Sequence, residues 1–357
     1  MMKRALVLAN GPRIQYRVLR CAGECFDEVY VLGANDAYLL KRSRFCEKYI
    51  DFTGDFANIR QSDLADIRRL CAVHKIDMVL PSCSRTTRLL AAHGAEFGAP
   101  YYPVPDQETF DALDDKWRFA GVCADLGLPV PLTRRFETMA DLRRDPDCGR
   151  LEFPLILKPA AMSGGYGVRR IDSADALPEH LSYTPIICQA YVPGEELSAF
   201  YLCEAGTIFA SFSYRRTLTK LEEIRVPAID AHASRLVAHF RYDGVIGFDV
   251  RRRPDGEIAF IECNPRFWYH MEVAMLAGLN FVTLGCRLRE GEGGPADSDT
   301  LKIRSPRRLC GNLLTPWRLN RAERAYLRYI VRDPAISGWA AFQSAIGRYR
   351  LAGGQLL

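Results

Sequence analysis

The most constraining stretch of this sequence is a candidate β-hairpin at residues 244–266, GVIGFDVRRRPDGEIAFIECNPR. Two segments with β-type alternation flank Asp255 and Gly256, and an Asp-Gly pair between such segments is a strong hairpin signal. If these two residues form a two-residue turn, Asp249 lies directly opposite Glu262. Two carboxylates placed in this way repel each other unless something neutralises them.

Asn264 belongs to the same face of this hairpin, because side chains two residues apart along a strand point to one side. Asp, Glu and Asn oxygens suit Mg²⁺, which usually keeps several waters and shares its shell with nucleotide phosphates. The hairpin therefore indicates a Mg²⁺–nucleotide site made of Asp249, Glu262 and Asn264. A polar hairpin face whose acids meet the arginines at 251–253 in solvent is the alternative.

The composition is that of an ordinary globular protein. A length of 357 residues allows two or three domains, and 48% hydrophobic with 25% charged residues excludes a disordered chain. A net charge of +5 favours anionic ligands weakly and does not indicate a nucleic-acid partner. The 12 cysteines show no CxxC or metal-finger spacing, and no apolar run approaches the length of a membrane span. We expect a cytoplasmic protein with reduced thiols.

The first part of the chain predicts a parallel, Rossmann-like sheet across residues 1–110. Short apolar segments alternate with helical intervals there, and they lie at residues 4–9, 29–34 and 76–82. The dinucleotide fingerprint GxGxxG is absent, so this sheet does not imply NAD. Gly11 fits a turn better than a phosphate-binding loop.

The next segment, residues 111–128, is predicted to form one helix that ends at Gly127 and Pro129. Its expected apolar face consists of Leu113, Trp117, Ala120, Val122 and Leu126. Lys116 projects from the first half of this helix, either as a solvated surface lysine or as a ligand-binding one.

A strand that delivers Lys158 is followed by a glycine-rich loop. The loop is not a Walker A motif, because no Gly-Lys-Ser/Thr follows its glycines. Small residues let successive backbone N–H groups approach phosphate oxygens, and they are Ser163, Gly164, Gly165 and Gly167. A lysine ahead of such a loop suits phosphate neutralisation, although a glycine-rich hairpin turn also explains the pattern.

Residues 186–202 indicate a strand, a Pro-Gly break and a second strand. Extended backbone of this kind can read an adenine edge, and Glu196 could accept hydrogen bonds from ribose hydroxyls. A further strand at 207–216 leads into a charged segment, 217–225. Its basic residues form either a solvated edge or an anion-binding wall, and with the end of the strand they are Arg215, Arg216, Lys220 and Arg225.

Taken in order, these elements resemble the ATP-grasp superfamily of carboxylate–amine ligases. The resemblance covers roughly residues 1–285 and rests on Lys116 after an aspartate, Lys158 with its loop, QAYVPGEE at 189–196, and the Asp…Glu-x-Asn hairpin. The N-terminal part, including SRFCEKYIDF, looks like that of ATP-grasp carboligases related to the carbamoyl-phosphate synthase large chain.

The resemblance implies a mixed α/β and α+β fold. Its expected parts are a Rossmann-like domain at 1–110, a small ATP-binding subdomain at 111–190 and an antiparallel-sheet subdomain with the metal site at 191–288. Beyond them the composition changes and predicts a polar linker at 289–300 and a basic helical tail at 301–357. The tail carries eleven Lys and Arg against two acids. We expect helices at 320–331 and 335–350 that pack on the core; contact with a membrane surface or an acidic carrier protein is the alternative.

The resemblance also implies roles for individual residues. Lys116 and Lys158 would contact ATP phosphates, and Arg266 would hold a substrate carboxylate or the acyl phosphate, so Lys158 and Arg266 are the expected catalytic residues. Asp249, Glu262 and Asn264 would bind Mg²⁺, with Mn²⁺ as a substitute. The other expected ATP-binding residues are Ser163, Gly164, Gly165, Gly167, Gln189, Ala190, Tyr191, Val192 and Glu196. Arg215, Arg216, Trp268 and His270 lack a family counterpart.

The activity implied by the resemblance is a two-step ligation. A substrate carboxylate attacks the γ-phosphorus of ATP to give an acyl phosphate and ADP, and an amine then displaces phosphate. The implied partners are a small-molecule carboxylate and an amine, with a homodimer compatible with the sequence. An ATP-grasp small-molecule kinase and a non-catalytic nucleotide-binding protein are the alternatives.

Overall fold

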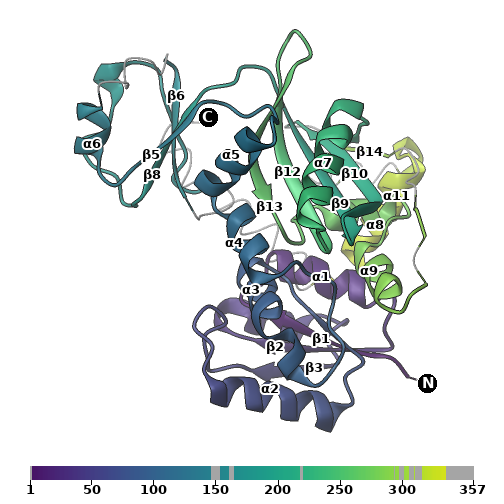
Figure 1. Cartoon of the computed structure of the whole chain (residues 1–357). Helices are drawn as coiled ribbons and strands as arrows, with labels where there is room; N and C mark the ends of the chain where they lie inside the picture. The colour runs from purple at the N-terminus through teal and green to yellow at the C-terminus, as the bar shows by residue number, and fades with distance from the viewer. Residues whose placement is uncertain are drawn as a thin grey trace.

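The structure is a computed structural model that describes residues 2–145, 153–160, 165–217, 220–292, 294–296, 301–304, 309 and 316–334. It contains three sheets, with a parallel sheet at the base of Figure 1, a large sheet above it and a small sheet to one side. The predicted mixed α/β and α+β fold is confirmed. None of the described helices is long and apolar enough to cross a membrane.

The N-terminal sheet is parallel, as predicted. Its strand order is β3-β2-β1-β4, and the strands are β1 (Arg4–Ala9), β2 (Glu28–Gly33), β3 (Lys48–Asp51) and β4 (Met78–Leu80). The helical elements between and after these strands are α1 (Ile14–Ala22), η1 (Asn35–Arg42), α2 (Gln61–His74), α3 (Ser84–His93) and η2 (Gly94–Phe97). Strands β1 and β2 are buried on both faces, which explains their continuous apolar sequence, whereas the edge strand β3 is exposed or half-buried.

The prediction of one helix at 111–128 is wrong. Two helices occupy this region, α4 (Gln107–Asp114) and α5 (Lys116–Asp125). Asp115 leaves the helical conformation, and its carboxylate caps α5 by accepting hydrogen bonds from the N–H groups of Trp117 and Arg118, each at 2.9 Å. Trp117 does not belong to a buried face, since it is 39% exposed.

The small sheet is antiparallel and has the order β5-β8-β6-β7. Its strands are β5 (Thr133–Phe136), β6 (Leu155–Pro159), β7 (Arg169–Ile171) and β8 (Ile186–Ala190), with α6 (Met139–Arg144) and η4 (Ala174–Ala176) in the connections. α6 packs beside the sheet (Figure 1), and the shared core includes Met139, Leu142 and Leu155.

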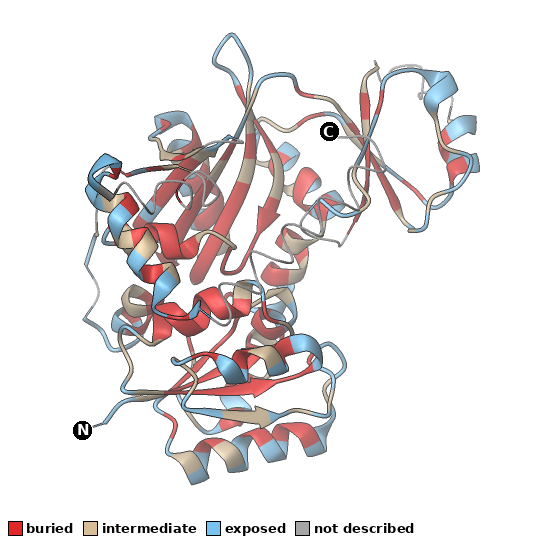
Figure 2. Cartoon of the chain, turned by 180° about the vertical axis from the view of Figure 1, so that it is seen from behind, coloured by how far each residue is buried: buried red, intermediate tan, exposed pale blue. Residues whose placement is uncertain are grey.

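The large sheet has six strands in the order β13-β12-β9-β10-β11-β14. They are β9 (Glu195–Glu204), β10 (Thr207–Arg216), β11 (Lys220–Glu223), β12 (Gly244–Arg252), β13 (Ile258–Asn264) and β14 (Lys302–Arg304). One face packs against α5 and α7 (Pro227–Phe240), and the other against α1, α8 (Met271–Leu276) and α9 (Phe281–Arg289). Figure 2 shows the central strands of this sheet as buried.

The hairpin of β12 and β13 does not have the predicted two-residue turn. Arg252 pairs with Ile258, and the N–H of Arg253 donates to the carbonyl of Glu257 at 2.7 Å, so the loop has three residues, 254–256. Gly256 has a φ of +93°, which is the left-handed conformation that ends such a loop.

A β-bulge in the same hairpin restores the predicted pairing of the acids. Val250 pairs with Phe260 and Asp249 with Glu262, so Ile261 is an extra residue on β13. The additional loop residue and the bulge residue offset each other in the register. Asp249 and Glu262 therefore face each other as expected, for a reason that the sequence pattern did not contain.

The described part of the tail packs on the core. The predicted helix at 320–331 is confirmed as α11 (Arg321–Val331), preceded by η5 (Pro316–Arg318). Tyr326 and Tyr329 are buried in the cluster that also contains α1 and α8, whereas Trp317 is 74% exposed. The second predicted helix, 335–350, lies outside the described residues.

Replacing Glu323 with Gln is expected to loosen α11 from β14. The Glu323 side chain is 3% exposed and accepts hydrogen bonds from Nε and Nη2 of Arg304 at 2.6 and 2.8 Å. These hydrogen bonds hold the pKa of Glu323 below its ordinary value. The stabilisation is therefore complete above the unfolded-state pKa and is lost as pH falls through the folded-state pKa.

We expect E323Q to lower the free energy of unfolding by about 1–3 kcal/mol at pH 7, measured by urea denaturation. The deficit relative to the parent should shrink below about pH 4. The matched change E257Q, in the exposed hairpin loop, should alter the stability by less than about 0.5 kcal/mol. An E323Q protein as stable as its parent at pH 7 would contradict this role.

Candidate active site

Two carboxylates form the centre of the candidate site. Asp249 pairs with Glu262 on one side and with Ser198 of β9 on the other, and the Ser198 hydroxyl donates to Asp249 Oδ1 at 2.9 Å. Burial and the neighbouring Glu262 carboxylate raise the pKa of Asp249. Burial opposes ionisation of Glu262 too, but Lys116 and Lys158 hold the pKa of Glu262 below its ordinary value.

Lys158 joins the small sheet to this centre. Its side chain is buried on β6, and Nζ donates to Gln189 Oε1 at 2.9 Å and to the carbonyl of Ile261 at 3.1 Å. Gln189 is itself held by a 2.9 Å hydrogen bond from Nε2 to the hydroxyl of Thr133. The bulge residue Ile261 thus contributes its carbonyl to the site. Burial lowers the pKa of Lys158 to about 8.

Lys116 approaches the same acids from α5. The break at Asp115 makes Lys116 the first residue of this helix, and its N–H donates to the carbonyl of Ala160 at 3.2 Å. Its side chain is 8% exposed and places Nζ 3.4 Å from Glu262 Oε2. Of the two interpretations of Lys116, the solvated surface lysine is therefore wrong, because the side chain is buried against a carboxylate.

Arg266 connects the acids to the N-terminal sheet. This buried guanidinium donates from Nη2 to Asn264 Oδ1 at 2.6 Å and from Nε to the hydroxyl of Ser84 at 3.0 Å. The Ser84 hydroxyl in turn donates to Asp114 Oδ1 at 3.1 Å. The sequence analysis missed Ser84 and Asp114. A signal for Ser84 existed, because it follows the carboxyl end of β4, the usual ligand-binding edge of a parallel sheet.

The side chains of Asp249, Glu262 and Asn264 could bind a divalent cation if the Asn264 amide rotates. The described residues hold no group of three His, Cys, Asp or Glu side chains that could bind a metal alone. Two opposed carboxylates and an amide nevertheless suit Mg²⁺ that takes its other ligands from water and phosphates. Nδ2 of Asn264 faces the acids, 3.3 Å from Asp249 Oδ2 and 3.4 Å from Glu262 Oε1. A half-turn of this amide would present its oxygen to a cation.

The predicted adenine connector lies where β8 leaves the small sheet. The N–H groups of Ala190 and Tyr191 donate to the carbonyls of Leu132 and Pro154 at 2.9 and 3.2 Å. The carbonyl of Val192 accepts from Nε of Arg251 at 3.0 Å. Gln189 points toward Lys158 instead of outward, so its side chain positions the lysine.

The remaining predicted nucleotide contacts are peripheral to the acid pair or partly outside the described residues. Glu196 is 65% exposed and lies 4.0 Å from Arg251 Nη1. Gly165 and Gly167 have φ values of +73° and +76°, a backbone conformation that favours glycine. Ser163 and Gly164 lie outside the described residues. The ATP-binding roles of all these positions remain predictions.

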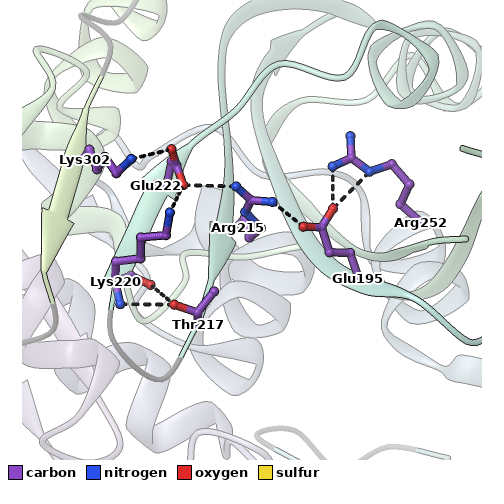
Figure 3. A network of polar contacts seen from close by, with 7 residues as sticks. All are labelled: Glu195, Arg215, Thr217, Lys220, Glu222, Arg252 and Lys302. Carbon is purple, nitrogen blue, oxygen red and sulfur yellow. Dashed lines mark hydrogen bonds and ion pairs between the residues drawn. The ribbon is translucent and has the colours of Figure 1, made fainter. Parts of the chain in front are cut away.

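The charged segment around β11 forms an ion-pair network (Figure 3). Arg215 pairs with Glu195 and Glu222, and Glu222 also accepts from Lys220 and Lys302 at 2.7 and 3.1 Å. These cations lower the pKa of Glu222 to about 2. Arg215 and Lys220 therefore fit the interpretation as a paired, solvated edge and not as an anion-binding wall.

Trp268 is buried in the core, and His270 is half-buried beside aromatic rings. The Trp268 ring stacks on Phe200 with centroids 4.2 Å apart. The His270 ring makes edge contacts with Tyr214 and Tyr269 at 5.8 and 5.0 Å. Burial lowers the pKa of His270 to about 3, so this imidazole is neutral at pH 7. These contacts give both residues a structural role.

Comparisons with known proteins place the central part of the chain in a protein family. The family model of the ATP-grasp domain matches residues 113–268, and this part of the chain belongs to the ATP-grasp family. The carbamoyl phosphate synthase large chain of Thermomicrobium roseum is 23% identical over 210 residues, or 57% of this chain and 17% of that protein. The same enzyme chain of Deinococcus radiodurans is 30% identical over 106 residues, or 30% of this chain and 10% of that protein. The chain thus covers less than a fifth of either relative.

Solved structures share the fold at low sequence identity. The Aspergillus clavatus carboxyaminoimidazole ribonucleotide synthase complexed with ATP has a TM-score of 0.66 and 19% identity, covering 84% of this chain and 80% of that one. The biotin carboxylase domain of Hydrogenobacter thermophilus 2-oxoglutarate carboxylase, with MgADP and bicarbonate, has a TM-score of 0.63 and 16% identity, covering 84% and 72%. An L-amino acid ligase from Bacillus licheniformis has a TM-score of 0.60 and 15% identity, covering 82% and 76%.

Replacing Gln189 with Glu is expected to raise the pKa of Lys158. Lys158 loses its proton as pH rises through about 8, because burial disfavours the ammonium. A carboxylate in place of the Gln189 amide, 2.9 Å away, would favour the charged form and move the pKa back toward its ordinary value. NMR titration of the Lys158 side chain measures both values.

The matched variant Q189M removes the hydrogen-bond acceptor without adding charge, so it should move the Lys158 pKa below about 8. The same Lys158 midpoint in the parent and both variants would show that Gln189 does not set the charge of this lysine.

Proposed function

We propose that this protein is an ATP-dependent ligase that activates a substrate carboxylate as an acyl phosphate and joins it to an amine, releasing ADP and phosphate. One observation carries the proposal: Lys116, Lys158 and Arg266 converge on two opposed, half-buried carboxylates, Asp249 and Glu262. Such a combination suits transfer of a phosphoryl group between anions, where positioning and electrostatic stabilisation supply most of the catalysis.

The shared fold supports this proposal. The solved structures of the same architecture include one complexed with ATP, one with MgADP and bicarbonate, and one named as an L-amino acid ligase. For this chain, Asp249 and Glu262 would hold Mg²⁺, with Asn264 after rotation of its amide. A bound Mg²⁺ would neutralise phosphate charge and orient the γ-phosphoryl group.

The chain's own cations have distinct tasks in this proposal. Lys158 and Lys116, buried beside Glu262, would meet the phosphate oxygens of ATP. Arg266 uses Nε, Nη1 and Nη2 in its contacts with Ser84, Phe267 and Asn264, one N–H each. A guanidinium has five N–H donors, so two remain to orient a substrate carboxylate, and the donor on Asn264 would be released as well when that amide turns its oxygen toward Mg²⁺.

The amine step requires a second property of the site. An acyl phosphate is hydrolysed unless water is excluded, and the glycine-rich loop that contains Gly165 and Gly167 is our candidate for closure over the phosphates. The attacking amine has to be neutral. The neutral His270 is half-buried beside aromatic rings, and we assign it no part in this proton transfer.

Glu262→Gln and Lys158→Ala are each expected to lower substrate-dependent ADP formation by at least about a hundredfold while leaving the fold intact. The first change removes a charge that faces Asp249 and the second removes a buried ammonium beside Glu262. Coupled detection of ADP measures the rate, and circular dichroism checks the fold.

The matched controls are Glu257→Gln, an exposed acid of the same hairpin, and Lys41→Ala, an exposed lysine of η1. Both should retain the parent rate. Near-parental turnover by folded E262Q or K158A would overturn the site assignment.

A screen that crosses amino acids, bicarbonate and other carboxylates with amines tests the activity itself. We expect ADP release that depends on both substrates, with a product whose mass equals that of the acid plus the amine minus water. A stable phosphorylated product with no amine requirement would replace the ligase with a kinase. No ADP release from any pair would favour a nucleotide-binding protein without catalysis.

A further inference from the structure

A cavity separate from the candidate active site lies between α1, α8, the start of α9 and α11, which pack together in Figure 1. Its volume is about 430 Å³, within the range of small-molecule sites. None of its lining residues belongs to the candidate active site. The lining includes Arg20, Arg328, Arg332, Glu24, Met275 and Leu276.

Arg20 is the unusual residue of this cavity. It is 1% exposed, yet among the described residues it forms no ion pair. Its Nη1 donates to the hydroxyl of Tyr16 at 3.0 Å, and its Nε has no hydrogen-bond partner. The guanidinium lies 3.5 Å from the ring centroid of Tyr329 and 4.8 Å from that of Phe45. With the ring of Tyr16 at 5.6 Å, three aromatic faces offset part of the cost of burying this charge, but a bound anion would offset more.

The acidic side chains near this cavity form their ion pairs with arginines other than Arg20. Glu272, buried on α8, pairs with Arg17 at 3.4 Å. Glu24 pairs with Arg332 at 3.4 Å, and both of these side chains are largely exposed at the rim. An exposed pair of this kind adds little stability, and Arg20 shares the electrostatic attraction of the single buried Glu272 carboxylate with Arg17, so two buried arginines face one buried acid.

Two further residues of the lining bear on a ligand. Tyr329 lines the cavity, and its hydroxyl is buried without a hydrogen-bond partner, so a ligand would reach this hydroxyl only after a movement of the side chain. Arg328 is the residue before Tyr329 in α11, and its side chain is exposed. It makes no ion pair within the part of the chain that the structure describes. The lining thus has three arginines against one glutamate. Met275 and Leu276 supply an apolar wall on α8.

We propose that this cavity is a second binding site, independent of the proposed ligase reaction, for a small organic oxyanion. Arg20 and Arg328 would hold its carboxylate or phosphate group, the Tyr329 hydroxyl would donate to it, and its apolar body would lie against Met275 and Leu276. Charge-assisted hydrogen bonds to buried arginines are among the stronger polar interactions in proteins.

The experiment measures binding of phenyl phosphate, benzoate and inorganic phosphate to the full chain, with benzyl alcohol as the uncharged probe. Calorimetry gives the affinities, and the thermal unfolding midpoint gives an independent readout. We expect at least one of the two aromatic anions to bind, benzyl alcohol not to bind, and inorganic phosphate to bind more weakly than phenyl phosphate. Comparison of phenyl phosphate with benzoate distinguishes a phosphate site from a carboxylate site.

Variants separate this cavity from the active site. Arg328→Ala should weaken the binding by about tenfold, the loss expected for one charge-assisted hydrogen bond. Arg20→Met should abolish it, and Lys158→Ala should leave it unchanged. Arg321→Ala removes the same charge from α11 outside the cavity and should also leave it unchanged. Because Arg328 is exposed, its variant remains informative if Arg20→Met does not fold.

Three results would overturn the proposal. They are the absence of binding by both aromatic anions, equal affinities in the parent and Arg328→Ala, and loss of binding in Lys158→Ala. The last result would place the anion in the ATP site.

Discussion

The opposition of Asp249 and Glu262 is the constraint on which the rest of the site depends. A hairpin fixes the two carboxylates on neighbouring strands, and burial makes their repulsion stronger than it would be in water. The surrounding residues compensate for this negative charge. Lys116 and Lys158 lower the pKa of Glu262, and the Ser198 hydroxyl donates a hydrogen bond to Asp249. The acid pair therefore determines which side chains this part of the protein can bury.

The same contacts hold the three sheets together. Lys158 reaches from the small sheet to the bulge carbonyl of Ile261 on the large sheet. Arg266, just beyond β13, reaches Ser84 at the start of α3 in the N-terminal layer. The groups that would neutralise phosphate and carboxylate charge thus lie at the junctions between layers. A relative movement of the layers would change the site directly, which suits the proposed enclosure of a nucleotide.

The sequence predicted which residues come together at the candidate site better than it predicted their geometry. The order of lysines, glycine-rich loop and hairpin acids was sufficient to predict the family. The spacing of apolar strand segments was sufficient to predict the parallel sheet. The predicted length of the hairpin loop was one residue too short. Asp249 lies opposite Glu262 only because a bulge at Ile261, which was not predicted, compensates for the longer loop. The helix break at Asp115 had a local signal, since aspartate is a preferred N-cap. The position of Ser84 after β4 was a signal for this residue, but no sequence pattern predicted its contact with Arg266, because that contact depends on how two layers pack.

Binding of Mn²⁺ in the presence of ADP, followed by electron paramagnetic resonance, tests the central claim most directly. Mn²⁺ takes the same oxygen ligands as Mg²⁺ and reports its own bound fraction. The acid pair predicts tight Mn²⁺ binding that requires the nucleotide and weakens by at least about tenfold in Asp249→Asn, whereas Glu257→Gln leaves it unchanged. Equal Mn²⁺ affinity in the parent and Asp249→Asn would contradict the assignment of this hairpin as the metal–nucleotide site.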